Sequence, residues 1–219
     1  MIFLILIGKI IKMSKLYFRY STMGAGKSLD LLKTAHNYEE RKKKVFLLTS
    51  DLDNRFGKKK ITSRVGISRE AKTFTKETNI FDMVLASYNH TKSQHEVIVD
   101  KPSCILIDES QFLTKEQVWQ LTDIVDNLNI DVITYGLRSD YKAEPFEGSI
   151  YLMTLSDEIE ELKTICEFGD KASMNMRLLN GEPVFEGEQV QIGGNESYLP
   201  VCRKYFKTVR ENASPYIDF

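Results

Sequence analysis

Short apolar runs alternate with longer segments of helical periodicity between residues 16 and 135. The predicted strands cover residues 16–20, 45–49, 104–107 and 130–135. The predicted helices cover residues 29–42, 80–87 and 114–128, and the last begins with the capping-box sequence Thr114-Lys-Glu-Gln117. Strands that alternate with helices in this way are typical of an α/β fold, in which a mostly parallel sheet carries helices on both faces.

From about residue 162 the pattern changes to short extended pieces separated by glycines. These pieces are predicted at residues 162–166, 172–178 and 189–192, with Gly181, Gly187 and Gly193-Gly194 among them. The sequence therefore predicts an α/β domain at residues 16–161 and a small β-rich domain at residues 162–208. A C-terminal tail is predicted at residues 209–219.

The first twelve residues are strongly apolar but are predicted to lie outside the fold. A membrane-spanning helix needs about 20 apolar residues, and a secretory signal needs a basic start and a small-residue cleavage site. Residues 1–15 are therefore interpreted as an N-terminal extension, which is either disordered or the product of a mis-called start codon, since Met13 lies just before the first strand.

The segment Ser21-Thr-Met-Gly-Ala-Gly-Lys-Ser28 separates the first predicted strand from the first predicted helix. A glycine-rich loop in this position turns unpaired backbone N–H groups and the positive end of a helix toward phosphate groups. We interpret it as a P-loop, in which Lys27 adds a charge near the outer phosphates and the Ser28 hydroxyl binds Mg²⁺. The usual pattern has glycine where this chain has Ser21, and the alternative is an ordinary loop that caps a helix.

The apolar run Cys104-Ile-Leu-Ile107 ends in two acids, Asp108 and Glu109. Because parallel strands end at the same edge of a sheet, this buried strand would deliver Asp108 beside the P-loop, as a Walker B strand does. Asp108 would hold Mg²⁺, directly or through water, and Glu109 would be available as a general base. The alternative makes both acids ordinary residues at the start of the next helix.

Two further loops leave strands at the same predicted edge. Residues 50–57 carry Asp53 and Arg55, which would face phosphates or the metal, although a solvated turn is an equally good interpretation. Residues 136–146 carry Tyr141 and Phe146, which would either line a pocket for a flat ligand or pack in the core.

The composition adds two expectations. With 28% charged residues and a net charge of −1, the chain gives no reason to expect a nucleic-acid or membrane partner. Three cysteines, Cys104, Cys166 and Cys202, do not make a disulfide framework in a chain of 219 residues. A reducing, cytoplasmic compartment is therefore expected.

Three longer stretches and four shorter ones, taken together, carry a family resemblance. The longer ones are Ser21–Ser28, Asp108-Glu-Ser-Gln-Phe112, and Gln191-Ile-Gly-Gly-Asn-Glu-Ser-Tyr198 with Val201-Cys-Arg-Lys204. The shorter ones are Asp53-Asn-Arg-Phe56, Ser63-Arg-Val-Gly66, Tyr135-Gly-Leu-Arg138 and Thr164-Ile-Cys166. From residue 16 to about 206 the chain resembles the thymidine kinases of bacteria, some viruses and animal cytosol.

This resemblance implies a P-loop NTPase fold of the RecA-like type with a small lasso domain. It implies transfer of the ATP γ-phosphoryl group to the 5′-hydroxyl of thymidine, or of deoxyuridine, giving dTMP for the salvage of DNA precursors. Glu109 would take the hydroxyl proton, while Ser28 and Asp108 would hold Mg²⁺. A homotetramer and feedback by thymidine triphosphate (dTTP) are further implications of the family.

The resemblance also implies two sets of binding residues. Those for ATP are Ser21, Thr22, Met23, Gly24, Ala25, Gly26, Lys27, Ser28, Asp53, Asn54, Arg55, Asp108, Glu109, Ser110 and Gln111. Those for the nucleoside are Met23, Phe112, Leu137, Tyr141, Phe146, Gln189, Val190, Gln191, Ile192, Gly193 and Tyr198. Backbone groups of the lasso loop at residues 189–193 would read the thymine edge, since its glycine permits a close approach.

The zinc site of the family is degenerate in this chain. Relatives bind a structural zinc at the base of the lasso through cysteines and an occasional histidine, and the matching positions here are Cys166, Phe168, Cys202 and Tyr205. Structural zinc takes four ligands, and two of these residues cannot serve. We predict that zinc binds weakly or not at all, and that Phe168 and Tyr205 pack together in its place.

Two other classes of function stay open at this stage. A P-loop switch protein of the GTPase kind would need an Asn-Lys-x-Asp element, which the sequence lacks. A kinase-like protein without activity is the other alternative, but Lys27, Asp108 and Glu109 are all present.

Overall fold

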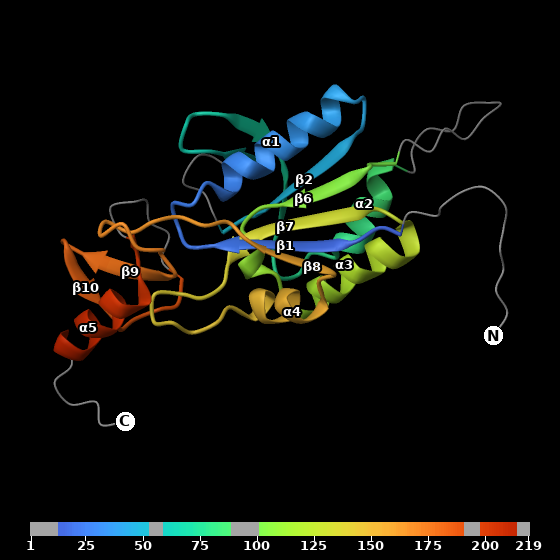
Figure 1. The fold of residues 1–219 in the computed structure, drawn as a ribbon. Helices are drawn as coiled ribbons and strands as arrows, with labels where there is room; N and C mark the ends of the chain where they lie inside the picture. The colour runs from blue at the N-terminus through green and yellow to red at the C-terminus, as the bar shows by residue number, and fades with distance from the viewer. Residues whose placement is uncertain (1–12, 53–58, 89–100, 191–197, 214–219) are drawn as a thin grey trace, which may run out of the picture.

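The computed structural model describes residues 13–52, 59–88, 101–190 and 198–213. Six strands form one sheet in the order β5-β2-β6-β7-β1-β8, and each neighbouring pair is parallel. The strands are β1 (Leu16–Ser21), β2 (Val45–Ser50), β5 (Lys72–Phe74), β6 (Cys104–Ile107), β7 (Asp131–Leu137) and β8 (Glu158–Glu161). The helices around it are α1 (Lys27–Glu40), α2 (Ile80–Tyr88), α3 (Lys115–Leu128) and α4 (Glu147–Leu155). The predicted α/β class is confirmed (Figure 1).

Both faces of the sheet are covered, as Figure 1 shows for α1 on one side and for α3 and α4 on the other. Along β6, Ile105 and Ile107 pack with α2, α3 and α4, whereas Cys104 and Leu106 pack with α1. All four side chains are fully buried. Strands buried on both faces appear in a sequence as continuous apolar runs, which is why the central strands were predictable.

A short hairpin covers the outer side of α1. Its strands are β3 (Lys60–Thr62) and β4 (Ser68–Glu70), which pair antiparallel. Ile61 is buried with Leu31 and Ala35 of α1, and Arg69 forms an ion pair with Glu39 near the end of that helix. These contacts fix the hairpin along α1.

A second, smaller sheet lies beyond the carboxyl end of β1. Its strands pair antiparallel in the order β10-β9-β11, with β9 at Met174–Leu179, β10 at Glu182–Val184 and β11 at Tyr198–Val201. Helix α5 (Arg203–Ala213) closes it. Phe206 of α5 is buried with Met174, Met176 and Val201, and its ring meets that of Phe185 edge-on at 5.5 Å.

Several predicted features of this second unit were wrong. Residues 162–166 form no strand; Ile165 makes only an isolated bridge with Lys171, beside a turn in which Cys166 N donates to Asp170 O at 2.8 Å. Residues 189–190 are not in a strand, and residues 191–192 lie outside the described part of the chain. A strand, β10, forms beside Gly181, where the sequence indicated only a break. Short polar segments in this region take their structure from their partners, which a local pattern does not reveal.

The predicted boundary between residues 208 and 209 falls inside α5. Tyr205, Phe206 and Val209 share one side of this helix and pack against the small sheet, so its stability comes from tertiary contacts. The edge strand β8 was also missed, because three of its four residues are glutamates and its place is set by main-chain pairing with β1.

The capping box at the start of α3 is confirmed. The backbone N–H of Gln117 donates to Thr114 Oγ1 at 3.2 Å, and that of Thr114 donates to Gln117 Oε1 at 3.1 Å. In the stretches that the structure describes, which exclude residues 1–12, no helix has the length and apolar character needed to cross a bilayer.

Candidate active site

The loop between β1 and α1 has the conformation of an anion-binding loop. Gly24 and Gly26 have φ angles of 82° and 78°, in the left-handed region that favours glycine. Among the described residues, no side chain caps α1, which begins at Lys27. The first backbone N–H groups of the helix and its positive end therefore face the loop.

Lys27 folds back over this loop. Its side chain is buried, and Nζ donates to Thr22 O at 2.9 Å and to Ser21 Oγ at 3.2 Å. The Ser21 hydroxyl in turn donates to Thr22 O at 2.9 Å. Ser21, which stands where the usual P-loop pattern has glycine, thus helps to position the lysine.

Asp108 lies beside the P-loop, as the sequence predicted. It directly follows β6, and its Oδ2 accepts a hydrogen bond from Ser28 Oγ at 2.8 Å. Burial raises the pKa of Asp108 to about 7, and the nearby charge of Glu109 adds to this effect, while the Ser28 bond and the Lys27 charge oppose it. A carboxylate and a hydroxyl in contact are hard oxygen donors, so this pair fits Mg²⁺.

Glu109 has a strained backbone and a fixed side chain. Its φ is 53°, which is uncommon for a residue other than glycine, and its N–H donates to Asp108 Oδ1 at 3.0 Å. The side-chain amide of Gln111 donates to Glu109 Oε2, and Gln111 Oε1 accepts from Leu137 N at 3.0 Å. Gln111 therefore ties the Glu109 carboxylate to the end of β7.

The 3₁₀ turn η1 (Ser110–Phe112) that follows Glu109 is closely backed by two elements. A Cβ atom on Gly136 of β7 would lie 2.6 Å from Ser110 Oγ. A Cβ atom on Gly148 of α4 would lie 2.7 Å from both Ser110 O and Leu113 O. Because only glycine permits these approaches, β7 and α4 hold the turn rigidly beneath Glu109.

The aromatic residues expected around the nucleoside form two contacts. The rings of Phe112 and Phe146 meet edge-on, with centroids 5.9 Å apart. Tyr141 is 1% exposed, and the guanidinium of Arg177 lies 5.0 Å from its ring centroid. Tyr198 pairs with Arg177 across β11 and β9, which brings it into the same region. The Tyr141 hydroxyl is buried and has no hydrogen-bond partner in the part of the chain that is described.

Two residues of β9 were missed by the sequence reasoning. Asn175 Oδ1 accepts from Met23 N at 2.8 Å, and its Nδ2 donates to Ser139 O at 3.2 Å. Arg177 lies over the Tyr141 ring and is the strand partner of Tyr198. Both are polar positions that alternate with apolar ones along residues 174–178, and this period of two was the available signal.

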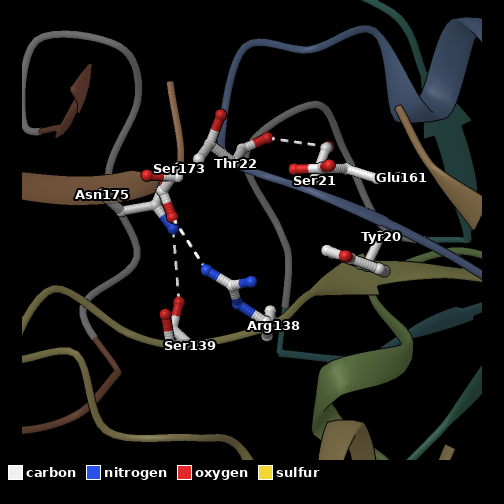
Figure 2. A pocket seen from close by; sticks show the side chains of 8 residues that line it. All are labelled: Tyr20, Ser21, Thr22, Arg138, Ser139, Glu161, Ser173 and Asn175. Carbon is white, nitrogen blue, oxygen red and sulfur yellow. Dashed lines mark hydrogen bonds between the residues drawn. The ribbon is translucent and has the colours of Figure 1, made fainter. Parts of the chain in front are cut away.

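Figure 2 shows the small pocket where the end of β1 meets β9. Its lining consists of Tyr20, Ser21, Thr22, Arg138, Ser139, Glu161, Ser173 and Asn175. Arg138 Nη2 donates to Ser173 O at 3.3 Å, next to the bond from Asn175 to Ser139. These bonds join the smaller sheet to the P-loop side of the larger one.

The remaining predicted site residues divide into three groups. Met23 within the P-loop and Leu137 at the end of β7 are half-buried, whereas Ser110 and Gln111 are buried. Gln189 is half-buried and Val190 is exposed. The predicted residues that lie outside the described part of the chain are Asp53, Asn54, Arg55, Gln191, Ile192 and Gly193.

At the degenerate zinc site, the predicted contact between Phe168 and Tyr205 is confirmed, with ring centroids 4.8 Å apart. Cys166 and Cys202 are free thiols. Burial opposes ionisation of Cys166, but backbone N–H groups of Phe168, Cys202 and Asp170 hydrogen-bond its sulfur and lower its pKa. Within the described residues, no three His, Cys, Asp or Glu side chains are grouped to hold a metal.

Comparison with known proteins identifies the family. The model of the thymidine kinase family matches residues 14–206. A thymidine kinase of Mannheimia succiniciproducens is 53% identical over 196 residues, which cover 89% of this chain and 96% of the relative. Thymidine kinases of Haemophilus influenzae (strain Rd) and Lactococcus lactis are 52% and 50% identical, each over 89% of this chain and over 97% and 98% of their own lengths. The chain therefore belongs to the thymidine kinase family.

Proposed function

We propose that this protein transfers the γ-phosphoryl group of ATP to the 5′-hydroxyl of thymidine, and of deoxyuridine, giving dTMP for the salvage of DNA precursors. The observation that carries the proposal is one constellation at one sheet edge. Ser28 of the P-loop bonds Asp108 at 2.8 Å, and Glu109 follows directly with its carboxylate held by Gln111. This arrangement occurs in a chain that is about half identical to named thymidine kinases.

Each of these groups has a chemical role in the proposed reaction. The P-loop and Lys27 hold the phosphates of ATP. Ser28 and Asp108 hold Mg²⁺, whose charge, when it is bound, offsets that of the phosphates. The 5′-oxygen of the nucleoside bonds to the γ-phosphorus as the bond from that phosphorus to ADP breaks, and the hydroxyl proton passes to the Glu109 carboxylate.

The nucleoside is proposed to lie among the aromatic residues near the end of β7. Phe112, Phe146 and Tyr141, with Leu137 and Met23, would wall the base, and Tyr198 would lie against the nucleoside. The buried Tyr141 hydroxyl, which lacks a partner among the described residues, supports a polar contact with a ligand there. Residues 162–208 would form the lasso domain, with backbone groups of residues 189–193 reading the thymine edge.

The family likeness also supports a homotetramer, feedback by dTTP and a cytoplasmic location. A molecule of dTTP joins a thymidine to a triphosphate, so it could occupy the nucleoside and phosphate parts of one site together.

Incubation of the purified protein with thymidine and Mg-ATP tests the function. We expect dTMP and ADP in equal amounts by chromatography, and no dTMP from a Lys27→Ala control. Failure to phosphorylate either thymidine or deoxyuridine, with ATP still bound, would favour a kinase-like protein without this activity. Hydrolysis of GTP in the absence of nucleoside would favour a P-loop switch.

Zinc content is a separate prediction. We expect atomic emission to find far less than one zinc per chain, because Phe168 and Tyr205 occupy two of the four ligand positions. Their contact should instead stabilise the base of the small sheet, so Tyr205→Ala should lower the free energy of unfolding by about 1 kcal/mol. A stoichiometric zinc ion that survives dialysis would contradict this prediction.

A further inference from the structure

Hydrogen bonds fix the backbone of the turn in the β3–β4 hairpin, and Arg64 lies in this turn. Ser63 is 3% exposed and closes the turn at both ends. Its N–H donates to Ile67 O at 2.8 Å, its Oγ accepts from Ile67 N at 3.2 Å, and its carbonyl accepts from Gly66 N at 3.0 Å. Gly66 has a φ of 89°, so the turn requires a glycine there. Arg64 lies in the turn between Ser63 and Gly66, and its side chain is exposed.

The hairpin is also fixed relative to the P-loop. Ile61 is 1% exposed and packs with Leu31 of α1, while Arg69 pairs with Glu39 at the far end of that helix. The hairpin therefore runs along α1, and its turn reaches the end of the helix where the P-loop lies (Figure 1).

The guanidinium of Arg64 lies against the P-loop itself. A Cβ atom on Gly24 would be 3.2 Å from Arg64 Nη1 and 3.8 Å from Pro200 Cγ of β11. Gly24 and Gly26 both have left-handed φ angles, so this is the part of the loop whose backbone suits an anion. The other cation of the loop, Lys27, has a buried side chain. Arg64 thus adds a second charge on the exposed side.

Two other arginines near β1 bind other groups. Arg19 pairs with Asp30 and Glu160. Arg138 donates a hydrogen bond to Ser173 O where the larger sheet meets the smaller one. Arg64 is the arginine that the described structure brings to the glycines of the P-loop.

We propose that Arg64 is a phosphate-binding residue, which contacts the triphosphate of ATP and stabilises the charge of the transferring phosphoryl group. This proposal rests on the proposed function. A guanidinium presents a planar fork of donors that matches phosphate oxygens, and it stays charged at all working pH values. An arginine brought to the phosphates by an element outside the P-loop is a known means of accelerating phosphoryl transfer. The hairpin supplies this arginine from within the same chain.

The test compares Arg64→Gln and Arg64→Lys with the control Arg41→Gln, which changes an exposed arginine just after α1 whose side chain donates to Asn37 O at 2.8 Å. For Arg64→Gln we expect kcat/KM for ATP to fall roughly 10²-fold or more, with KM for thymidine within about twofold of wild type. Arg64→Lys should recover part of the loss, because an ammonium restores the charge without the fork. Arg41→Gln should stay within about threefold of wild type in both parameters, because exposed side chains away from the site have small effects.

Two outcomes would overturn the assignment. One is wild-type kcat/KM for ATP in Arg64→Gln. The other is an equal loss toward ATP and thymidine together with a fall in melting temperature, which would indicate a structural role. If the wild-type protein fails to phosphorylate thymidine, the proposed function fails by itself. Equilibrium binding of a fluorescent ATP analogue to the wild type and to Arg64→Gln then tests the contact with the triphosphate. Binding by Arg64→Gln that is at least tenfold weaker supports the contact, and unchanged binding refutes it.

Discussion

Replacement of Glu109 by Gln is expected to lower kcat for thymidine roughly 10²- to 10⁴-fold, while ATP and thymidine still bind. An amide has nearly the shape of a carboxylate, and its oxygen can still accept the hydrogen bond from Gln111. It cannot take the proton of the 5′-hydroxyl. The variant therefore removes the general base but keeps the side-chain shape and its hydrogen bond with Gln111.

Steady-state kinetics and equilibrium binding of each substrate would separate these effects. Glu116→Gln, on the exposed first turn of α3, is the matched control and should keep wild-type kcat. A Glu109→Gln enzyme that retains more than about a tenth of the wild-type kcat would mean that another group accepts the proton. Loss of thymidine binding in this variant would instead point to a role for Glu109 in holding the nucleoside.

Replacement of Asp108 by Asn is expected to have opposite effects on activity and on stability. With Mg-ATP the variant should lose at least 10²-fold in activity, because a neutral amide is a poor partner for Mg²⁺. Without metal it should be more stable than the wild type at about pH 8. Folding buries Asp108 and raises its pKa to about 7, so the native state binds this proton more tightly than the unfolded chain does.

The sign of the pH dependence follows from this difference. Between about pH 4 and 7 the native state holds more protons at Asp108 than the unfolded state, so the free energy of unfolding falls as the pH rises. At about 1.4 kcal/mol per pH unit, the loss approaches an upper limit of about 4 kcal/mol above pH 7. Asn cannot ionise, so the variant should escape this loss, and the two proteins should converge near pH 4.

Denaturant unfolding in EDTA at about pH 5 and pH 8 would measure the effect. Asp126→Asn, on the exposed side of α3, is the control and should show no such gain at pH 8. Equal stability of wild type and Asp108→Asn at pH 8 would contradict the prediction. Addition of Mg²⁺ should stabilise the wild type more than the variant, since binding favours the charged carboxylate.

Much of the α/β unit was predictable because its signals are local. β1, β2, β6 and β7 lie within one or two residues of the predicted strands, since apolar runs of this length and spacing have few other uses. The start of α3 was predictable because Thr114 and Gln117 cap it within one turn. The P-loop and the two acids after β6 were likewise contained in short stretches whose chemistry depends on residue type and order.

The tertiary structure alone decided which distant groups meet at the site. Met23 and Asn175 are 152 residues apart in the chain, yet one hydrogen bond of 2.8 Å links them. Arg64 reaches Gly24 only because the hairpin packs along α1, and Gln111 orients Glu109 only because β7 lies beside its turn. β8 and α5 belong to the same class, because partners rather than their own patterns stabilise them. The sequence by itself determined which chemical groups are present and where the central strands lie, because the causes of both are local. The folded chain determined which of these groups act together, because that depends on contacts between distant residues that no local pattern encodes.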